Sequence, residues 1–430
     1  MVNKKWFLVA AIVACLGFGV WYSAPWNQPV PPIDESLTTI RFGMLPYGDH
    51  TQAIIGVEKG WFKEVGIDLQ HEVIKIENLV PFLSSGTLDV CSSPAGLLYP
   101  AYKAAPNLSV FVFADIFQGY AIVANPGLGC KSFSEFVGSG LTPDEAFKKT
   151  VSQLRGRTFA YPSEAAIKPF IDIVLQKGGV TREDFTSLVQ DDALTINAMR
   201  NNSADFQVGG APSRIVLQRE GFKSIISSQD IAQYAKPSHL SQELGSVFPD
   251  GWATSRKRYE NDLPTILRLA SVCFRINDLI VNHPDEALRI HMPYLSKVTG
   301  ESFTVESGKI IYNDLDPFYT FEQQNAWFHD EKNPYFYRHI NGAGLQSFID
   351  QGIYEDTPPD IETFILADDV YLKMEELKSE SLNLIERIET ENIANSIELQ
   401  ARLVTAKHHL EIYNYFDSHR IAEEIIRDAQ

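Results

Sequence analysis

The residues IRFGMLPYGDHTQAIIGVEKGWFKEVGIDLQ, at positions 40–70, carry the clearest fold signal in the chain. An apolar run at 38–45 predicts a strand, and the amphipathic pattern at 50–66 predicts a helix that ends at Gly66. The alternating run at 67–76 predicts a second strand. Two strands joined through a helix are typical of a parallel βαβ unit. This stretch therefore predicts an α/β protein with mostly parallel sheets.

The alternation of strands and helices extends well beyond this unit and then starts again. A first series ends with the strand YAIVAN at 120–125. A second series begins with a helix at 142–154, which Thr142 caps, and it ends near Ser228. Helical patterns dominate after Trp252. We therefore expect two lobes, with the second inserted into the first: lobe I over 38–120 and 229–372, and lobe II over 121–228.

Composition excludes several classes of protein. The 430 residues include 37 Lys+Arg against 55 Asp+Glu, and the resulting net charge of −18 argues against a protein that neutralises nucleic-acid phosphates. Hydrophobic residues at 44% and charged residues at 21% exclude wholesale disorder. The four cysteines are far apart and form no CxxC pair, which excludes zinc ribbons and iron–sulfur sites.

The N-terminus predicts a signal or anchor segment over 1–26, followed by a Pro-rich linker over 27–37. Two lysines precede an apolar run long enough to span a bilayer. Three outcomes stay open: an uncleaved membrane anchor, lipidation at Cys15, or cleavage after Ala24. Each places the body of the protein on the periplasmic side of the inner membrane.

The C-terminal segment 373–430 contains neither Pro nor Gly. Its apolar residues recur at spacings of three and four, which predicts helices with coiled-coil character. Two interpretations stay open. The helices dock on the body of the protein, or they form a coil that self-associates or binds a partner.

The order of several stretches indicates a family. The stretch at 40–70 is followed by LSSGTLDVCSSPAG at 83–96, then by LRGRTFAYPSEAAIKPFIDIVLQKGG at 154–179, and by SADFQVGGAPSRIVLQREGF at 203–222. Over 38–372 the chain resembles the substrate-binding proteins of ABC importers, in the group that handles nitrate, alkanesulfonates, taurine and the pyrimidine precursor of thiamine. The resemblance implies a two-lobed type II periplasmic-binding-protein fold, also called a Venus flytrap, and an ABC permease as partner.

In such a fold the solute lies between the lobes, against loops at the carboxyl ends of strands and against helix N-termini. The resemblance implies four such loops. Each also has an ordinary structural interpretation as a turn, a helix cap or a solvated first turn. The aromatic residues added to this site are also typical of a core. The predicted ligand-binding residues are Tyr47, Gly48 and Asp49; Ser92 and Ser93; Ser163 and Glu164; Gly210, Ala211 and Arg214; and the aromatic Tyr120 and Trp252.

No catalytic motif is present: the chain has no GxSxG, no HExxH and no P-loop. We therefore expect a protein that is not an enzyme and that uses no cofactor or metal. The predicted function is capture of a small solute, anionic in the manner of sulfonate, nitrate or taurine, for an ABC importer. An aminopyrimidine is the alternative solute. The alternative function is a membrane-anchored sensor or scaffold whose C-terminal coil binds a partner.

Overall fold

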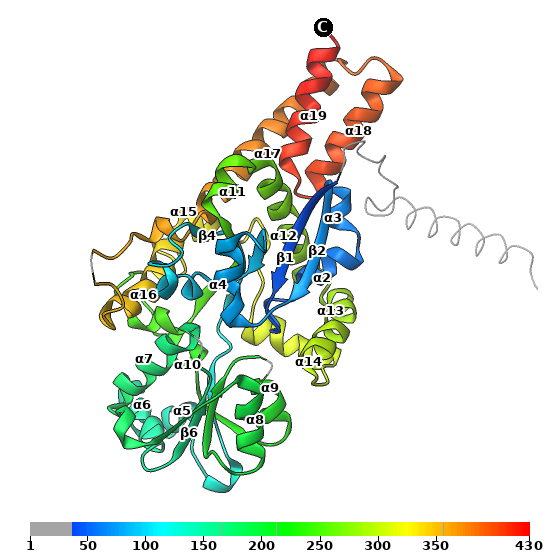
Figure 1. Ribbon diagram of the computed structural model, residues 1–430. Coiled ribbons are helices and arrows are strands. Elements are labelled where there is room, and N and C mark those ends of the chain that lie inside the picture. The colour runs from blue at the N-terminus through cyan, green and yellow to red at the C-terminus, as the bar shows by residue number, and fades with distance from the viewer. Residues whose placement is uncertain (1–36, 164, 212, 356) are drawn as a thin grey trace, which may run out of the picture. The chain divides into compact units, whose positions relative to one another are not determined.

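The computed structural model describes residues 37–163, 165–211, 213–355 and 357–430 (Figure 1). The segments predicted for 1–36, with Cys15, and the predicted site residue Glu164 lie outside this description. Among the described residues, no helix is both long enough and apolar enough to cross a membrane.

The first sheet belongs to lobe I and has five strands in the order β2-β1-β3-β10-β4. Strand β1 runs parallel to β2 and β3, as the βαβ pattern predicts. Strand β10 enters later in the chain and pairs antiparallel with both β3 and β4. The strands are β1 (Thr38–Met44), β2 (Ile67–Val73), β3 (Val90–Ser92), β4 (Leu108–Phe117) and β10 (Phe248–Ser255).

The second sheet belongs to lobe II and has the order β7-β6-β8-β5-β9. It has its own apolar core, with α6 and α7 on one side and α8 and α9 on the other (Figure 1). Its strands are β5 (Ala121–Ala124), β6 (Thr158–Tyr161), β7 (Thr186–Val189), β8 (Phe206–Gly209) and β9 (Lys223–Ser227). Its helices are α5 (Phe133–Gly138), α6 (Pro143–Ser152), α7 (Lys168–Gly178), α8 (Asp192–Arg200), α9 (Ser213–Arg219) and α10 (Ser228–Ala232). The α/β class is confirmed.

Helices follow β10, and the chain then returns to the first sheet. Ile365 forms a parallel bridge with Val110 of β4, and Phe318 forms an antiparallel bridge with Asp115 of the same strand. The helices that accompany the first sheet are α2 (Ala53–Glu58), α3 (Trp61–Glu64), α4 (Ile76–Ser85), α11 (Arg256–Asn261), α12 (Leu263–Asn282), α13 (Pro284–Thr299), α14 (Val305–Ile310), α15 (Asn325–His329) and α16 (Tyr337–Asp350).

The residues Glu375–Gln430, with Glu64–Gly66, form a compact unit separate from Leu37–Lys63 and Ile67–Met374. Three helices supply its described part: the end of α17 (Ala367–Thr390), α18 (Ile397–Glu411) and α19 (Tyr415–Asp428). Their apolar residues make a core of their own, which includes Ile388, Ala406 and Ile425. Self-association or partner binding through these helices stays a prediction.

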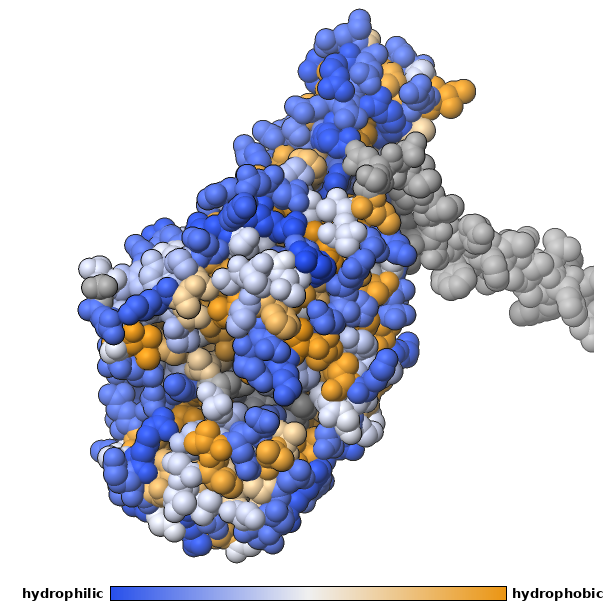
Figure 2. Space-filling view, in the orientation of Figure 1, coloured by the Kyte–Doolittle hydropathy of each residue, from blue (hydrophilic) through white to orange (hydrophobic). Residues whose placement is uncertain are grey.

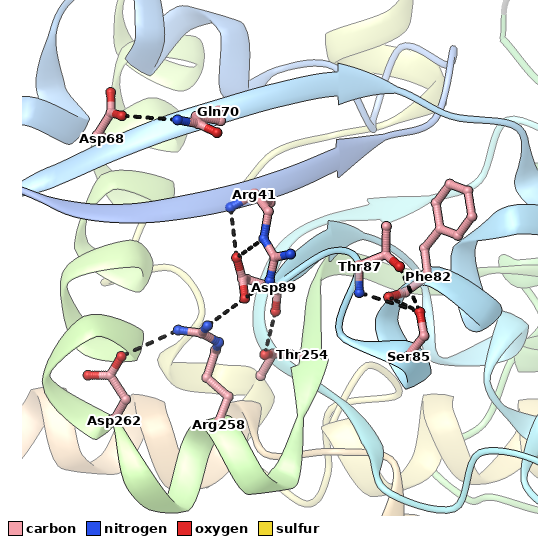
Figure 3. Close-up of polar contacts among 10 residues, drawn as sticks. All are labelled: Arg41, Asp68, Gln70, Phe82, Ser85, Thr87, Asp89, Thr254, Arg258 and Asp262. Carbon is pink, nitrogen blue, oxygen red and sulfur yellow. Dashed lines mark hydrogen bonds and ion pairs between the residues drawn. The ribbon is translucent and has the colours of Figure 1, made fainter.

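One buried carboxylate connects three elements of the first lobe (Figure 3). Asp89, just before β3, accepts hydrogen bonds from Nε and Nη2 of Arg41 in β1, both at 2.9 Å. It also accepts one at 2.5 Å from Arg258 in α11. The backbone oxygen of Asp89 accepts from Thr254 of β10 at 2.8 Å. Burial opposes the charged carboxylate, but the Arg41 hydrogen bonds and the Arg258 charge outweigh it, so the pKa of Asp89 is lowered.

We predict that Asp89→Asn lowers the free energy of unfolding by about 1.5–3 kcal/mol at pH 7, because it removes charge-assisted hydrogen bonds. The wild-type advantage is full above the unfolded pKa near 3.8 and is lost as pH falls through the lower folded-state pKa. Urea denaturation at pH 7 and at pH 3 measures both effects. Asp68→Asn is the control, because the Asp68 carboxylate lies at the surface, 3.5 Å from the Gln70 amide. Equal losses in the two variants at pH 7 would contradict the role of this network.

Candidate functional site

A small cavity lies between the two lobes. Its volume is about 40 Å³, which is room for a few water molecules. It adjoins an open cleft of about 870 Å³ and shares Tyr47, Ile76 and Asp192 with it. Figure 2 shows hydrophobic residues gathered in the middle of a largely hydrophilic face. The cavity wall consists of Leu45, Tyr47, Asp49, His50, Ile76, Pro94 and Leu97 from lobe I, Pro162, Ala166, Ile167, Asp192, Gly209, Gly210 and Ala211 from lobe II, and Phe117, Tyr120 and Phe248 where the chain crosses between the lobes.

Five predicted site residues line this cavity, and both lobes supply them. Tyr47 and Asp49 follow β1, whereas Gly210 and Ala211 follow β8, and Tyr120 precedes β5. They meet because strand ends of the two sheets face each other across the cleft. A sixth, Ser163, is exposed and lines the outer cleft. Contact of these residues with a solute stays a prediction.

Three predicted residues lie inside the first lobe, without surface in the cavity. Ser92 is fully buried and accepts a hydrogen bond from the backbone N–H of Leu45 at 3.3 Å. Ser93 is fully buried and donates to the backbone oxygen of Pro94 at 3.0 Å. Trp252 is fully buried between aromatic rings of the core. The Ser92 hydroxyl joins β3 to the residue after β1, and the Ser93 hydroxyl bonds within the loop after β3, so we do not retain these residues as solute contacts.

Gly48 and Arg214 also differ from the sequence-based prediction. A Cβ at Gly48 would lie 2.9 Å from the Ile311 side chain, so this glycine permits close packing, and it is not among the residues of the cavity wall. Arg214 is neither a solvated first-turn residue nor a residue of the cavity wall. It is buried and donates to the backbone oxygen of Gly119 at 3.1 Å, and burial lowers its pKa against the opposing charges of Asp230, Asp314 and Asp316.

A cluster of buried acids surrounds the floor of the cavity, and the sequence analysis predicted only one of its members, Asp49. Asp49 is 3% exposed, and Asp115, Asp250 and Asp316 are fully buried. His50 lies among them, with Nε2 3.0 Å from Oδ2 of Asp250 and 3.7 Å from Oδ2 of Asp49. Asp250 of β10 is paired directly with Asp115 of β4. The one signal in the sequence is Asp115 itself, an acid within the otherwise apolar strand LSVFVFADIF.

Burial dominates the electrostatics of this cluster. It raises the pKa of Asp115, Asp250 and Asp316 well above the ordinary range, and the Asp49 charge raises all three further. Burial lowers the pKa of His50, with the Asp49 charge opposing it. Among the described residues that line the cavity, none is Lys or Arg. The described wall thus offers the carboxyl groups of Asp49 and Asp192 to a bound group.

Comparison of the sequence with known proteins identifies a family and two related bicarbonate-binding proteins. The sequence profile of the family described as NMT1/THI5 like matches residues 48–287. The bicarbonate-binding protein CmpA of Synechococcus sp. is 28% identical over 212 residues, which is 46% of this chain and 46% of that protein. The chain thus spans about half the length of the curated relatives it matches.

Two solved structures share the fold. The periplasmic aliphatic sulphonate binding protein SsuA from Escherichia coli has a TM-score of 0.56 at 12% identity, covering 78% of this chain and 100% of that one. The periplasmic nitrate-binding protein NrtA from Synechocystis PCC 6803 has a TM-score of 0.54 at 16% identity, covering 78% and 88%.

Two sheets with flanking helices and a cavity between them define a two-lobed fold of the periplasmic-binding-protein type. Since the NMT1/THI5-like profile covers more than half of the chain, the chain belongs to that family, as the resemblance in its sequence predicts.

We predict that Gly210→Ala lowers the free energy of unfolding by about 1–3 kcal/mol, because a Cβ there would lie 2.8 Å from the Phe117 ring and force the cavity wall to shift. Gly138→Ala is the control: a Cβ there meets nothing within 4 Å, and alanine favours the helix α5. Urea denaturation of both variants measures the difference. If Gly210→Ala is as stable as Gly138→Ala, the Phe117 wall is not tightly packed.

Proposed function

We propose that this protein is the solute-binding component of an ABC importer and acts outside the cytoplasm. The observation that carries the proposal is a cavity lined by strand ends of both lobes, in a chain of the NMT1/THI5-like family. No catalytic role is proposed for any residue. The location and the membrane tether rest on the sequence pattern of 1–26.

Capture would depend on a hinge between the lobes. The chain crosses from β4 to β5 through 118–120 and returns from β9 to β10 through 228–247. Aromatic rings pack at these crossings: Phe117 lies 4.5 Å from Tyr120 and 4.8 Å from Phe248, between ring centroids. A solute that touches Tyr47 from one lobe and Ala211 from the other makes both contacts only when the lobes are closed. Binding therefore shifts the population toward the closed form that a permease would recognise.

The charge of the cavity narrows the class of solute. The relatives include proteins named for bicarbonate, sulphonate and nitrate, all of which are anions. Here the wall carries Asp49 and Asp192, and the floor carries the buried acids behind them. An anion bound alone would face these carboxylates without a Lys or Arg on the described wall. We therefore propose a solute that donates hydrogen bonds, with an aminopyrimidine favoured over a free sulfonate or nitrate.

We predict that one compound from a panel of aminopyrimidine, nitrate, bicarbonate, taurine and alkanesulfonate stabilises the protein by about 2.7 kcal/mol at 100 times its dissociation constant. Thermal unfolding with each compound measures this effect. Ala211→Leu should remove the response, because the added side chain fills the 40 Å³ cavity, whereas Gly138→Ala should keep it. A nitrate or sulfonate response in metal-free protein would contradict the proposed solute class. A full response in Ala211→Leu would place the solute elsewhere.

A second candidate function is a sensor or scaffold that binds a partner through the C-terminal helices. The observation in its favour is apolar exposure on α18: Ile397 is 88% exposed and Val404, seven residues later on the same helix face, is 62% exposed. A core of its own indicates that this unit is not needed to complete the two lobes.

We predict that deletion of 376–430 leaves solute-dependent stabilisation intact, because the cavity-lining residues all precede Met374. Thermal unfolding with the stabilising compound tests this expectation. Loss of the solute response with the fold retained, as judged by circular dichroism, would contradict the assignment of binding to the two lobes. Size-exclusion chromatography of both forms at the same concentration tests self-association through the helices.

A further inference from the structure

Three residues of the first lobe bring metal-ligand atoms together at the floor of the cavity. Asp49, His50 and Asp250 each offer one ligand atom, and these atoms all lie within 4.8 Å of one another. Each of the three residues is at most 5% exposed. Asp49 and His50 also line the cavity, so one side of the group faces open space.

The atoms of this group lack the hydrogen bonds that buried polar atoms usually have. Oδ1 of Asp49, Nδ1 of His50 and Oδ2 of Asp250 are buried with no hydrogen-bond partner. Asp250 Oδ2 and His50 Nε2 approach to 3.0 Å, but this contact does not have hydrogen-bond geometry. Oδ1 of Asp250 accepts from the backbone N–H of Gly251 at 2.6 Å, which fixes the carboxylate. Asp250 Oδ2 is both without a hydrogen-bond partner and close to His50 Nε2, so an ion bound between the two residues would supply its missing partner.

The spacing suits a small tetrahedral ion. Two ligand atoms bound to one Zn²⁺ at about 2.0–2.1 Å lie about 3.3–3.4 Å apart. The His50 Nε2 atom lies 3.0 Å from Asp250 Oδ2 and 3.7 Å from Asp49 Oδ2, so small side-chain shifts reach that spacing. Two carboxylates and a neutral imidazole balance a divalent charge. Ca²⁺ prefers six to eight oxygen ligands and Mg²⁺ an octahedral, largely hydrated shell, so an imidazole-containing group of three suits neither.

An ion pair that only stabilises the fold would explain fewer of these contacts than a metal site does. A His–Asp pair would explain the approach of His50 to Asp250. It leaves Asp49 Oδ1 without a partner, and the side-chain hydrogen bond between Asp49 and Asp250 keeps a proton between two carboxyl groups where a divalent ion could bind instead. Asp316 adds a further buried carboxylate, and the buried cation nearby, Arg214, is hydrogen-bonded to Gly119. The floor therefore holds more buried acids than the described cations around it could neutralise if all of the acids were ionised.

We infer that Asp49, His50 and Asp250 form a binding site for one divalent transition-metal ion of the zinc class. The cavity supplies the open fourth position, where water or a solute atom would bind. All three ligands belong to the first lobe, on the loop after β1 and on β10. The ion would thus bind without closure of the lobes, and this inference does not depend on the proposed transport function.

The experiment uses the full chain, freed of metal with a chelator and titrated with ZnCl₂ by calorimetry. We expect one Zn²⁺ per chain and a rise in thermal stability, with Mg²⁺ and Ca²⁺ giving neither. Co²⁺ should give the intense visible absorption of a tetrahedral site. His50→Gln and Asp250→Asn should each weaken Zn²⁺ binding at least tenfold. The double variant Asp68→Asn with His71→Gln is the control for binding to groups outside the cavity, and it should bind as the wild type does.

The metal-free variants separate a metal site from a structural ion pair. If Asp250 serves as a ligand, Asp250→Asn replaces a buried acid, whose ionisation burial opposes, by a neutral group of the same shape, and the metal-free variant should be at least as stable as the wild type. If Asp250 serves mainly as the partner of His50, the metal-free variant should be less stable, and that result would overturn the inference. Absence of stoichiometric Zn²⁺ binding, or equal affinity in wild type and His50→Gln, would also overturn it. Should Asp250→Asn fail to fold, Asp49→Asn, at the cavity surface, gives the same comparison.

Discussion

The antiparallel pairing of β10 with β4 determines both how the chain returns to the first sheet and which side chains lie below the cavity. The chain leaves the first lobe after β4, builds the second sheet, and returns as β10 between β3 and β4 of the first sheet. The return requires close backbone contact: a Cβ on Gly251 would lie 1.9 Å from the backbone oxygen of Val112. Glycine at this position therefore permits β10 to pair with β4 through backbone hydrogen bonds. The same pairing sets Asp250 opposite Asp115 and thereby creates the acidic floor of the cavity.

Placing these carboxylates side by side costs free energy that the fold must offset elsewhere. Two buried acids in register repel each other when charged, and burial alone penalises each charge. The first lobe handles Asp89 differently, since two arginines compensate its charge. At the floor of the cavity, the nearby arginine donates to a backbone oxygen and the acids keep unsatisfied atoms. A cluster of buried acids with raised pKa values and unsatisfied atoms is typical of a binding site, because ligand contacts can supply the missing interactions.

Local patterns in the sequence predicted the parts of the fold that depend on local interactions. The capping box of α6, with Glu145 N–H donating to Thr142 and the Thr142 N–H donating to Glu145, is an example. The rule that sites follow strand ends placed Tyr47 and Gly210 at the cavity. Ser92 and Trp252 could not be oriented in this way, because both lie on strands buried on both faces, where alternation does not distinguish core from cleft. The acid cluster depends on pairing between residues distant in the chain, which local patterns do not record.

The acids at the floor of the cavity also bear on the class of solute that the cavity can bind. In the proposed function, the carboxyl groups of Asp49 and Asp192 on the cavity wall accept hydrogen bonds from the solute and disfavour an oxyanion. A divalent ion held by Asp49, His50 and Asp250 would reverse that preference at its open position, because a bound cation is the largest local charge in such a site. The acidic cleft of this protein is therefore compatible with a fold that it shares with proteins named for the binding of anions. The sign of the local field at the strand ends, and not the net charge of −18, decides what such a cleft accepts.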